Sequence, residues 1–266
     1  MSALKLDLSG QVAVVTGSTS GIGQALAEGL AGCGAHIVLN GLGDRDEIEA
    51  LRAGIERDHG VTALYHDADM LVPDEIEDLI ASTVKRFGRL DILINNAGVQ
   101  HVARVEEMPV GKWDQIIAIN LTSAFHTIRH AVPVMREAGR GRIVNIASAH
   151  GHAASPFKSA YVAAKHGLIG LTKTVALEVA EANITVNAIS PGYVKTRLVE
   201  NQIEDTAKAR GISREEVVRD VMLHAQPTKK FVTEDELLGA LLYLVSDQGA
   251  STHGSAILVE GGWMAQ

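Results

Sequence analysis

The sequence predicts a single α/β domain, built on one doubly wound parallel sheet of seven strands with helices on both faces. Three observations support this fold class. Short apolar, β-branched runs alternate with helical patterns almost from end to end of the 266 residues. Most of these runs are continuously apolar, as expected for strands that are buried on both faces. No Pro- or Gly-rich linker and no internal repeat divides the chain, and this alternation implies right-handed βαβ crossovers.

The expected elements follow one another in a regular order. We expect strands at seven apolar runs: Val12–Thr16, His36–Leu39, Ala63–His66, Ile92–Asn95, Ile143–Ala147, Thr185–Ile189 and Ala256–Val259. We expect helices at the periodic stretches between them: Gly21–Gly32, Arg45–His59, Pro73–Phe87, Lys112–Ala138, Ser159–Glu181 and Glu234–Ser246.

The segment Leu198–Lys230 interrupts the alternation. It is a mostly polar helical stretch after the sixth expected strand, with no strand of its own. Ligands of doubly wound sheets bind beyond the carboxyl ends of the strands, which is where this insertion would lie. We therefore expect residues 198–230 to be a substrate lid within the single domain 1–266, with a surface decoration as the alternative.

Composition excludes several functions. The chain has 24 Lys and Arg against 32 Asp and Glu, a formal net charge of −8, which argues against a nucleic-acid surface. One cysteine, Cys33, excludes an internal disulfide, and we expect it to be packed. His66, Asp67 and Asp69 share one strand end without a complementary cluster, so we expect no metal.

Met1–Gly10 lacks the apolar stretch of a secretory signal and no run approaches a membrane span, which predicts a soluble, cytoplasmic protein without a membrane partner.

A glycine-rich turn follows the first expected strand. The sequence Thr16-Gly17-Ser18-Thr19-Ser20-Gly21-Ile22-Gly23 leads directly into the first expected helix. Three glycines at such a junction allow a tight turn, close approach of the backbone to a pyrophosphate, and close packing of helix on strand. The helix N-terminus then offers free N–H groups to the phosphates. A turn of this kind is weak evidence alone, but its position in an alternating chain predicts a dinucleotide site.

Tyr161 and Lys165 are four residues apart, so on a helix their side chains share a face. An alcohol that loses a hydride must also lose its hydroxyl proton, and a free tyrosine with a pKa of about 10 is a poor base near neutrality. A nearby ammonium group favours the phenolate. Ser148, at the end of the fifth expected strand, could hydrogen-bond the substrate oxygen. The Tyr–Lys spacing also suits a simple packing pair, but with Ser148 and the glycine turn it favours catalysis.

The chain resembles the classical short-chain dehydrogenases/reductases, and the resemblance covers essentially its whole length. Four motifs carry it in the expected order: Thr16–Gly23, Asn95-Asn96-Ala97-Gly98, Tyr161-Val162-Ala163-Ala164-Lys165 and Pro191-Gly192. The resemblance implies a Rossmann-type fold, a nicotinamide cofactor and a homotetramer, with the helices around Lys112–Ala138 and Ser159–Glu181 as dimer faces. It also assigns Asn120 to linking Lys165 with solvent through water, as a fourth member of the catalytic set.

The same resemblance implies a set of cofactor-binding residues, with Asp69 beside the adenine. They are Gly17, Thr19, Ser20, Gly21, Ile22, Gly23, Asn40, Asp69, Asn96, Ala97, Gly98, Tyr161, Lys165, Pro191, Gly192 and Val194. The second expected strand ends Leu39-Asn40-Gly41-Leu42-Gly43, with neither the acid typical of NAD sites nor the Arg typical of NADP sites. Asn40 can hydrogen-bond a hydroxyl but cannot neutralise a phosphate, which predicts NAD. Arg45 is the residue that could favour NADP instead.

A second polar set surrounds the expected catalytic residues. Gln100, His101, His150 and Lys158 lie at expected loops or helix starts, and Gln202 lies in the expected lid. A ketone needs only the Ser and Tyr hydroxyls, so the extra donors indicate an anion at the other end of the substrate. A carboxylate bound by the Lys158 charge and by amide donors is the simplest explanation, and predicts a small hydroxy acid/keto acid pair.

These segments are similar to those of the family members that oxidise D-3-hydroxybutyrate to acetoacetate. The similarity implies a substrate set of Gln100, Ser148, His150, Lys158, Tyr161, Tyr193, Gln202 and Trp263, with Trp263 from this subunit or a neighbour. Tyr193 departs from the tryptophan often found there, which leaves the preferred chain length open. Two alternatives remain: a 3-oxoacyl thioester reductase that uses NADPH, and a non-catalytic NAD-binding sensor.

Overall fold

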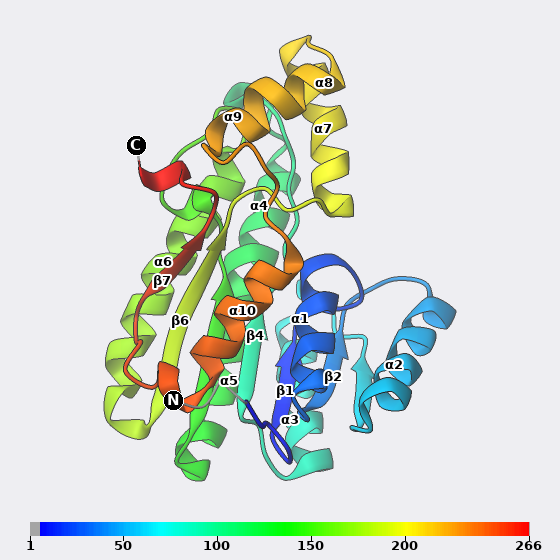
Figure 1. The fold of residues 1–266 in the computed structure, drawn as a ribbon, viewed down its shortest axis with the longest axis vertical. Helices are drawn as coiled ribbons and strands as arrows, with labels where there is room; N and C mark the ends of the chain where they lie inside the picture. Colours follow the sequence, from blue (N-terminus) through cyan, green and yellow to red (C-terminus); the bar gives the residue numbers. More distant parts are fainter. Residues whose placement is uncertain (1–5, 266) are drawn as a thin grey trace.

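Seven parallel strands form one sheet in the order β3-β2-β1-β4-β5-β6-β7 (Figure 1). The computed structural model describes residues 6–265, so residues 1–5 and 266 of the expected domain lie outside the described residues. The strands are β1 Val12–Val15, β2 His36–Asn40, β3 Ala63–His66, β4 Ile92–Asn95, β5 Gly141–Ile146, β6 Ile184–Pro191 and β7 Ala256–Val259. The strand order reverses between β1 and β4, which is the position where doubly wound sheets bind ligands. The expected fold class is confirmed.

Helices cover both faces of the sheet. Their bounds are α1 Gly21–Gly32, α2 Arg45–His59, α3 Pro73–Phe87, α4 Val110–Ile117, α5 Ser123–Ala138, α6 Ser159–Val179 and α10 Glu234–Val245. Buried side chains of α1, α2 and α10 form one apolar cluster with the sheet, and those of α3, α5 and α6 form another. In β1 the side chains alternate between the two: Ala13 and Val15 belong to the first cluster, and Val12 and Val14 to the second. This explains why β1 is apolar at every position.

Local sequence signals set several helix boundaries. The Asp44 side chain accepts hydrogen bonds from two backbone N–H groups in the first turn of α2, and Gly60 ends that helix in the left-handed conformation. Pro73 occupies the first turn of α3, and Gly88 ends it in the same way as Gly60. The bounds of α2 and α3 therefore coincide with those expected from the sequence.

The long helix expected at Lys112–Ala138 is interrupted. A π-helical turn at Ala118–Thr122 separates α4 from α5, and it carries the buried Asn120. The Asn120 side chain accepts a hydrogen bond from the N–H of Val99 at 2.8 Å and donates one to the carbonyl of Val99 at 2.9 Å. Single π-helical turns often occur at functional sites, and this one directs Asn120 toward the end of β4.

The insertion after β6 folds into short helices beyond the carboxyl ends of the strands (Figure 1). They are α7 Arg197–Arg210, α8 Arg214–Glu216, a π-helical segment Val217–Met222 and α9 Leu223–Ala225. A small apolar cluster joins them to the sheet and includes Tyr193, Val199, Ile203, Val217 and Met222.

Cys33 is half-buried at the C-terminus of α1, where it packs against the first apolar cluster, and this burial raises the pKa of its thiol. Between residues 6 and 265, no helix is both long enough and apolar enough to cross a membrane.

Candidate active site

A cavity of about 400 Å³ opens at the carboxyl ends of the strands, between the glycine turn, the end of β5, the start of α6 and α7. Most of the expected site residues line it: Gly17, Thr19, Ser20, Gly21, Ile22, Asn40, Asp69, Asn96, Ala97, Gly98, Gln100, Ser148, His150, Tyr161, Lys165, Pro191, Gly192, Tyr193, Val194, Gln202 and Trp263. Gly23, Asn120 and Lys158 do not line the cavity. His101 lines a separate hollow beside α7.

The glycine turn has the geometry expected of a phosphate-binding loop. Gly17 and Gly21 have φ angles of 62° and 56°, in the left-handed region that favours glycine. A Cβ on Gly17 would lie 2.8 Å from the Cα of Ala97, and a Cβ on Gly23 would overlap the carbonyl oxygen of Gly17. Ser20 precedes α1 without a side-chain capping bond, so the first N–H groups of α1 remain available to an anion.

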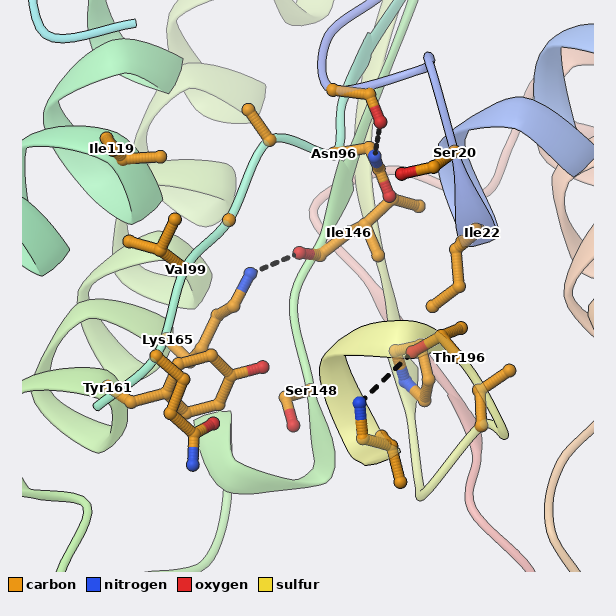
Figure 2. Close-up of a pocket in the computed structure, with 18 of the residues that line it drawn as sticks. Ser20, Ile22, Asn96, Val99, Ile119, Ile146, Ser148, Tyr161, Lys165 and Thr196 are labelled. Carbon is orange, nitrogen blue, oxygen red and sulfur yellow. Dashed lines mark hydrogen bonds between the residues drawn. The ribbon is translucent and has the colours of Figure 1, made fainter. Parts of the chain in front are cut away.

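Asn96 holds this turn in place. Its Nδ2 donates to the carbonyl oxygens of Thr16 at 3.0 Å and Gly17 at 2.9 Å. Figure 2 shows one hydrogen bond from Asn96 to this turn. The Thr16 hydroxyl in turn accepts hydrogen bonds from the N–H groups of Asn96 and Ala97. The ends of β1 and β4 are therefore fixed to each other. The role of Thr16 was not expected, although its position as the first residue of the turn signals it.

Asn40 differs from the expectation. Its side chain is fully buried, and its Nδ2 donates to the carbonyl oxygens of His66 at 3.1 Å and Ala68 at 2.9 Å. Its Oδ1 accepts from the N–H of Gly17 at 3.3 Å. This amide supports the glycine turn and the end of β3, because all of its donors are already engaged. We had expected Asn40 to donate to a ribose hydroxyl, and that expectation is wrong because its amide has no free donor.

Arg45 does not enter the cavity either. It forms an exposed ion pair with Asp67, 3.4 Å between Nη2 and Oδ2. Among the described residues that line the cavity, Lys165 is the only Lys or Arg, and it lies at the catalytic end. Asp69 also lines the cavity. Across the described residues, no group of three or more His, Cys, Asp or Glu is placed to hold a metal ion.

Ser148, Tyr161 and Lys165 come together as the sequence predicted. Ser148 follows β5, while Tyr161 and Lys165 lie on one face of α6, and the Tyr161 hydroxyl points toward the Ser148 side chain (Figure 2). The Lys165 ammonium donates to the carbonyl oxygen of Ile146 at 2.7 Å and lies 5.6 Å from the centre of the Tyr161 ring. Asn120 contacts Val99 rather than Lys165, so any link between Asn120 and Lys165 needs an intervening group.

Burial perturbs both titratable groups of this trio. It raises the pKa of Tyr161, although the hydrogen bond with Ser148 partly offsets the rise. It lowers the pKa of Lys165 to about 8. Each shift disfavours the charged form of a buried group. A further positive charge in the cavity would favour the Tyr161 phenolate, and an oxidised nicotinamide ring carries such a charge.

Lys158 lies directly behind the cavity wall. Its Nζ donates to the Tyr193 hydroxyl at 3.1 Å and to Oε1 of Gln202 at 3.4 Å, and it lies 3.3 Å from Nε2 of His150. These three partners line the cavity, whereas Lys158 itself is only 5% exposed. None of the ion pairs formed among the described residues involves Lys158.

The electrostatics of this cluster indicate a place for an anion. Burial, together with the charge of Arg210, lowers the pKa of Lys158 to about 7. Burial and the Lys158 charge lower the pKa of His150 to about 3, so the imidazole stays neutral. Nε2 of Gln100 is buried and has no hydrogen-bond partner. A carboxylate would satisfy the Gln100 donor and stabilise the Lys158 ammonium.

Trp263 belongs to the pocket of its own chain. Its ring stacks on Tyr193 with 5.6 Å between centres and meets the His150 ring edge-on at 5.0 Å. A neighbouring subunit is therefore not needed to bring a tryptophan to the cavity. Thr196, which caps the N-terminus of α7 and lines the cavity, was not expected, although a threonine before a helix is a recognisable signal.

A cavity beside a glycine turn, with a Ser–Tyr–Lys trio at the carboxyl edge of a doubly wound sheet, defines a class of nicotinamide-dependent oxidoreductases. The chain belongs to the short chain dehydrogenase family, because the sequence model of that family matches residues 11–207. It is an oxidoreductase of that family, which uses nicotinamide cofactors.

Relatives and solved structures agree with this assignment. The chain is 57% identical to a D-beta-hydroxybutyrate dehydrogenase of Rhizobium meliloti (strain 1021), over 96% of this chain and 99% of the relative. It is 50% identical to a protein of the same name from Cupriavidus necator, over 97% of this chain and 100% of the relative. A putative short-chain alcohol dehydrogenase from Sinorhizobium meliloti 1021 superimposes with a TM-score of 0.88 at 34% identity, over 98% of this chain and 99% of the other.

Proposed function

We propose that this protein oxidises D-3-hydroxybutyrate to acetoacetate with NAD, and catalyses the reverse reaction. The observation that supports this choice of substrate is the buried Lys158 ammonium beside the catalytic trio. Its side-chain hydrogen-bond partners are all neutral. A buried charge without a counter-charge is costly, so the site gains most from an anionic ligand. The two relatives named as D-beta-hydroxybutyrate dehydrogenases, at 57% and 50% identity, support the same substrate.

Tyr161 acts as the general base in the oxidation. Ser148 donates a hydrogen bond to the oxygen on carbon 3 of the substrate, and Tyr161 takes the hydroxyl proton as the carbonyl forms. NAD bound beside the trio would supply the acceptor for the hydride that leaves carbon 3. Lys165 holds the phenolate form of Tyr161 by its charge. In the reduction, Tyr161 returns the proton to the same oxygen. Asn120 would connect Lys165 with solvent through an intervening water, because its own side chain bonds the backbone of Val99.

The cofactor site is the glycine turn and its neighbours. Gly17, Gly21 and Gly23 leave room that a Cβ would fill, and the first N–H groups of α1 can receive the pyrophosphate. At the adenosine end the cavity presents Asp69 but no Arg or Lys among the described lining residues. Since Arg45 is paired with Asp67 outside the cavity, nothing there would neutralise a 2′-phosphate, which favours NAD.

The substrate carboxylate would lie opposite the catalytic trio. Gln100 and Gln202 face the cavity with amide groups, and the Lys158 charge lies one layer behind Gln202 and Tyr193. The insertion 198–230 would act as the lid over this end, because α7 contributes Gln202 and Val199 to the cavity lining. We further propose that the chain works as a homotetramer, which light scattering would test.

The alternative with a relative to support it is a 3-oxoacyl thioester reductase. A 3-oxoacyl-[acyl-carrier-protein] reductase of Staphylococcus epidermidis is 34% identical over 94% of this chain. A long neutral acyl chain would leave the Lys158 charge and the Gln100 amide unused, so the geometry favours the small acid.

The test is an NADH oxidation assay with acetoacetate, run beside NAD reduction with each enantiomer of 3-hydroxybutyrate. We expect turnover with acetoacetate and with the D enantiomer only, and at least about tenfold higher kcat/KM for NAD than for NADP, a difference of about 1.4 kcal/mol. Turnover of an acyl thioester with NADPH in place of these activities would refute both the substrate and the cofactor.

A further inference from the structure

Gln226 is a fully buried polar residue outside the cavity lining. It follows α9, where the lid segment turns back toward the sheet through residues 226–232. Its Oε1 accepts a hydrogen bond from the N–H of Tyr193, and its Nε2 donates to the carbonyl of Lys230. One side-chain amide therefore joins the end of β6 to the segment that leaves the lid.

The backbone of Tyr193 is held on both sides by this return segment. Its carbonyl oxygen accepts a hydrogen bond from the N–H of Val232 at 2.9 Å, and Val194 and Val232 form an isolated parallel bridge. The side chain of Tyr193 then reaches Lys158 with its hydroxyl and stacks on Trp263 with its ring. The position of the pocket wall thus depends on the return segment.

Neighbouring glycines make room for this amide. A Cβ on Gly192 would overlap Oε1 of Gln226 and lie 3.0 Å from the Cα of Glu260. Gly261 has a φ of 66°, and a Cβ there would lie 3.3 Å from the Cβ of Gln226. The residues that follow β6 and β7 therefore pack closely around the Gln226 side chain. This close packing indicates that Gln226 has one fixed position.

We propose that Gln226 is a positioning residue of the substrate pocket, which anchors residues 226–232 to the end of β6 and so holds Tyr193 against Lys158. The choice of substrate for its test rests on the proposed function, whereas the anchoring itself does not. Gln226 does not itself line the cavity, so it acts through the residues that it holds, chiefly Tyr193 and, by stacking, Trp263.

Two substitutions separate the two hydrogen bonds of the amide. Gln226→Met keeps a similar length and removes both bonds. Gln226→Glu keeps an acceptor for the Tyr193 N–H but places an oxygen against the Lys230 carbonyl. Thr83→Val is the matched control, because it removes a buried hydrogen bond to the Leu79 carbonyl on α3, away from the cavity. For each protein we would measure Tm, the Kd of NADH, kcat and KM for D-3-hydroxybutyrate, and trypsin cleavage after the exposed Lys229 and Lys230.

We expect Gln226→Met to raise KM about tenfold or more, with changes in kcat and in the Kd of NADH below about threefold. Trypsin should cleave after Lys229 and Lys230 about tenfold faster, since the anchored segment opens locally. Gln226→Glu should show smaller changes in the same direction. Thr83→Val should lower Tm while leaving KM and this cleavage at the wild-type values, which separates positioning from general destabilisation.

A wild-type KM in Gln226→Met overturns the positioning role, even if cleavage becomes faster. If Gln226→Met does not fold, Gln226→Glu decides by the same two measurements. If the wild-type protein does not act on D-3-hydroxybutyrate, the proposed substrate is wrong and trypsin decides the inference alone. In that case, equal cleavage in all four proteins overturns the anchoring, and faster cleavage confined to the Gln226 variants supports it.

Discussion

The ammonium nitrogen of Lys158 lies 3.1 Å from the hydroxyl oxygen of Tyr193, in a place where Lys158 is only 5% exposed. The Tyr193 hydroxyl stands between this charge and the cavity. Because burial raises the pKa of Tyr193, its hydroxyl stays neutral and can accept from Lys158 while it donates to a ligand. A carboxylate in the cavity would then complete a chain of hydrogen bonds that ends at a positive charge.

Lys158→Met should therefore weaken substrate binding without affecting the cofactor. The methionine keeps most of the length and removes the charge. Loss of a buried, hydrogen-bonded charge partner costs about 2–5 kcal/mol, so KM for D-3-hydroxybutyrate should rise at least about 30-fold. The Kd of NADH, from fluorescence titration, should stay within about twofold. Lys112→Met on the exposed start of α4 is the control. An unchanged KM in Lys158→Met would show that the carboxylate does not use this charge.

The pH dependence of acetoacetate reduction should report the same group. The pKa of Lys158 in the free enzyme is lowered to about 7 by burial, so its positive charge is present below that pH and lost above it. An anionic substrate needs that charge, and Tyr161 must be protonated to donate its proton. Tyr161 stays protonated well above that pH, because burial raises its pKa, so the loss of the Lys158 charge should lower kcat/KM for acetoacetate above about pH 7. Measuring kcat/KM for acetoacetate over a series of pH values, with the wild type and with Lys158→Met, checks this. The variant should not show the fall in kcat/KM near pH 7.

The same shift has a consequence for stability. The unfolded chain holds the Lys158 proton up to about pH 10.4, whereas the folded chain releases it near pH 7. Between these values the unfolded state binds more protons, so this group makes the folded protein more stable as pH rises from 7 toward 10. Bound carboxylate should weaken that trend, because it favours the charged form of Lys158 and so raises its pKa in the folded protein.

Much of this architecture could be predicted from the sequence, because the relevant signals are local. The capping residue Asp44, Pro73 in the first turn of α3, and Gly60 and Gly88 after α2 and α3 mark helix ends within a few residues of themselves. The glycine turn and the Tyr161–Lys165 pair are also short-range patterns. Their meeting at one edge of the sheet follows from the parallel strand order alone.

Other features depend on partners far away in the chain. Asn40 faces inward because the His66 and Ala68 carbonyls accept from it across the end of β3, and the sequence around Asn40 does not reveal this. Gln226 accepts a hydrogen bond from Tyr193, which lies 33 residues away in the chain, and no sequence pattern in the intervening lid predicts this contact. Such residues are identified only when the fold brings their backbone partners to them.

Tyr161→Phe tests the proton transfer. Phenylalanine keeps the ring that packs beside Lys165 and removes the hydroxyl that we propose accepts the substrate proton. General acid–base catalysis contributes roughly 10²–10⁴-fold, so kcat should fall by at least about 100-fold in both directions. The Kd of NADH should change little, because the glycine turn is untouched. Turnover within about fivefold of the wild type would assign the base to another residue.

Gly23→Ala tests the cofactor site from the packing of the glycine turn. The added methyl group would overlap the carbonyl oxygen of Gly17 and crowd the Asn96 amide that clamps the turn, and both are backbone-anchored groups with little room to move. We therefore expect the Kd of NADH to rise by about tenfold or more, equivalent to at least about 1.4 kcal/mol of binding free energy. Gly170→Ala on α6 is the matched control, since no atom outside its own helix lies within 4 Å of the added Cβ and a helical alanine is favoured by about 1 kcal/mol over glycine. Isothermal titration with NADH compares the two variants, and equal affinity in both would mean that the pyrophosphate does not bind over Gly17 and Gly23.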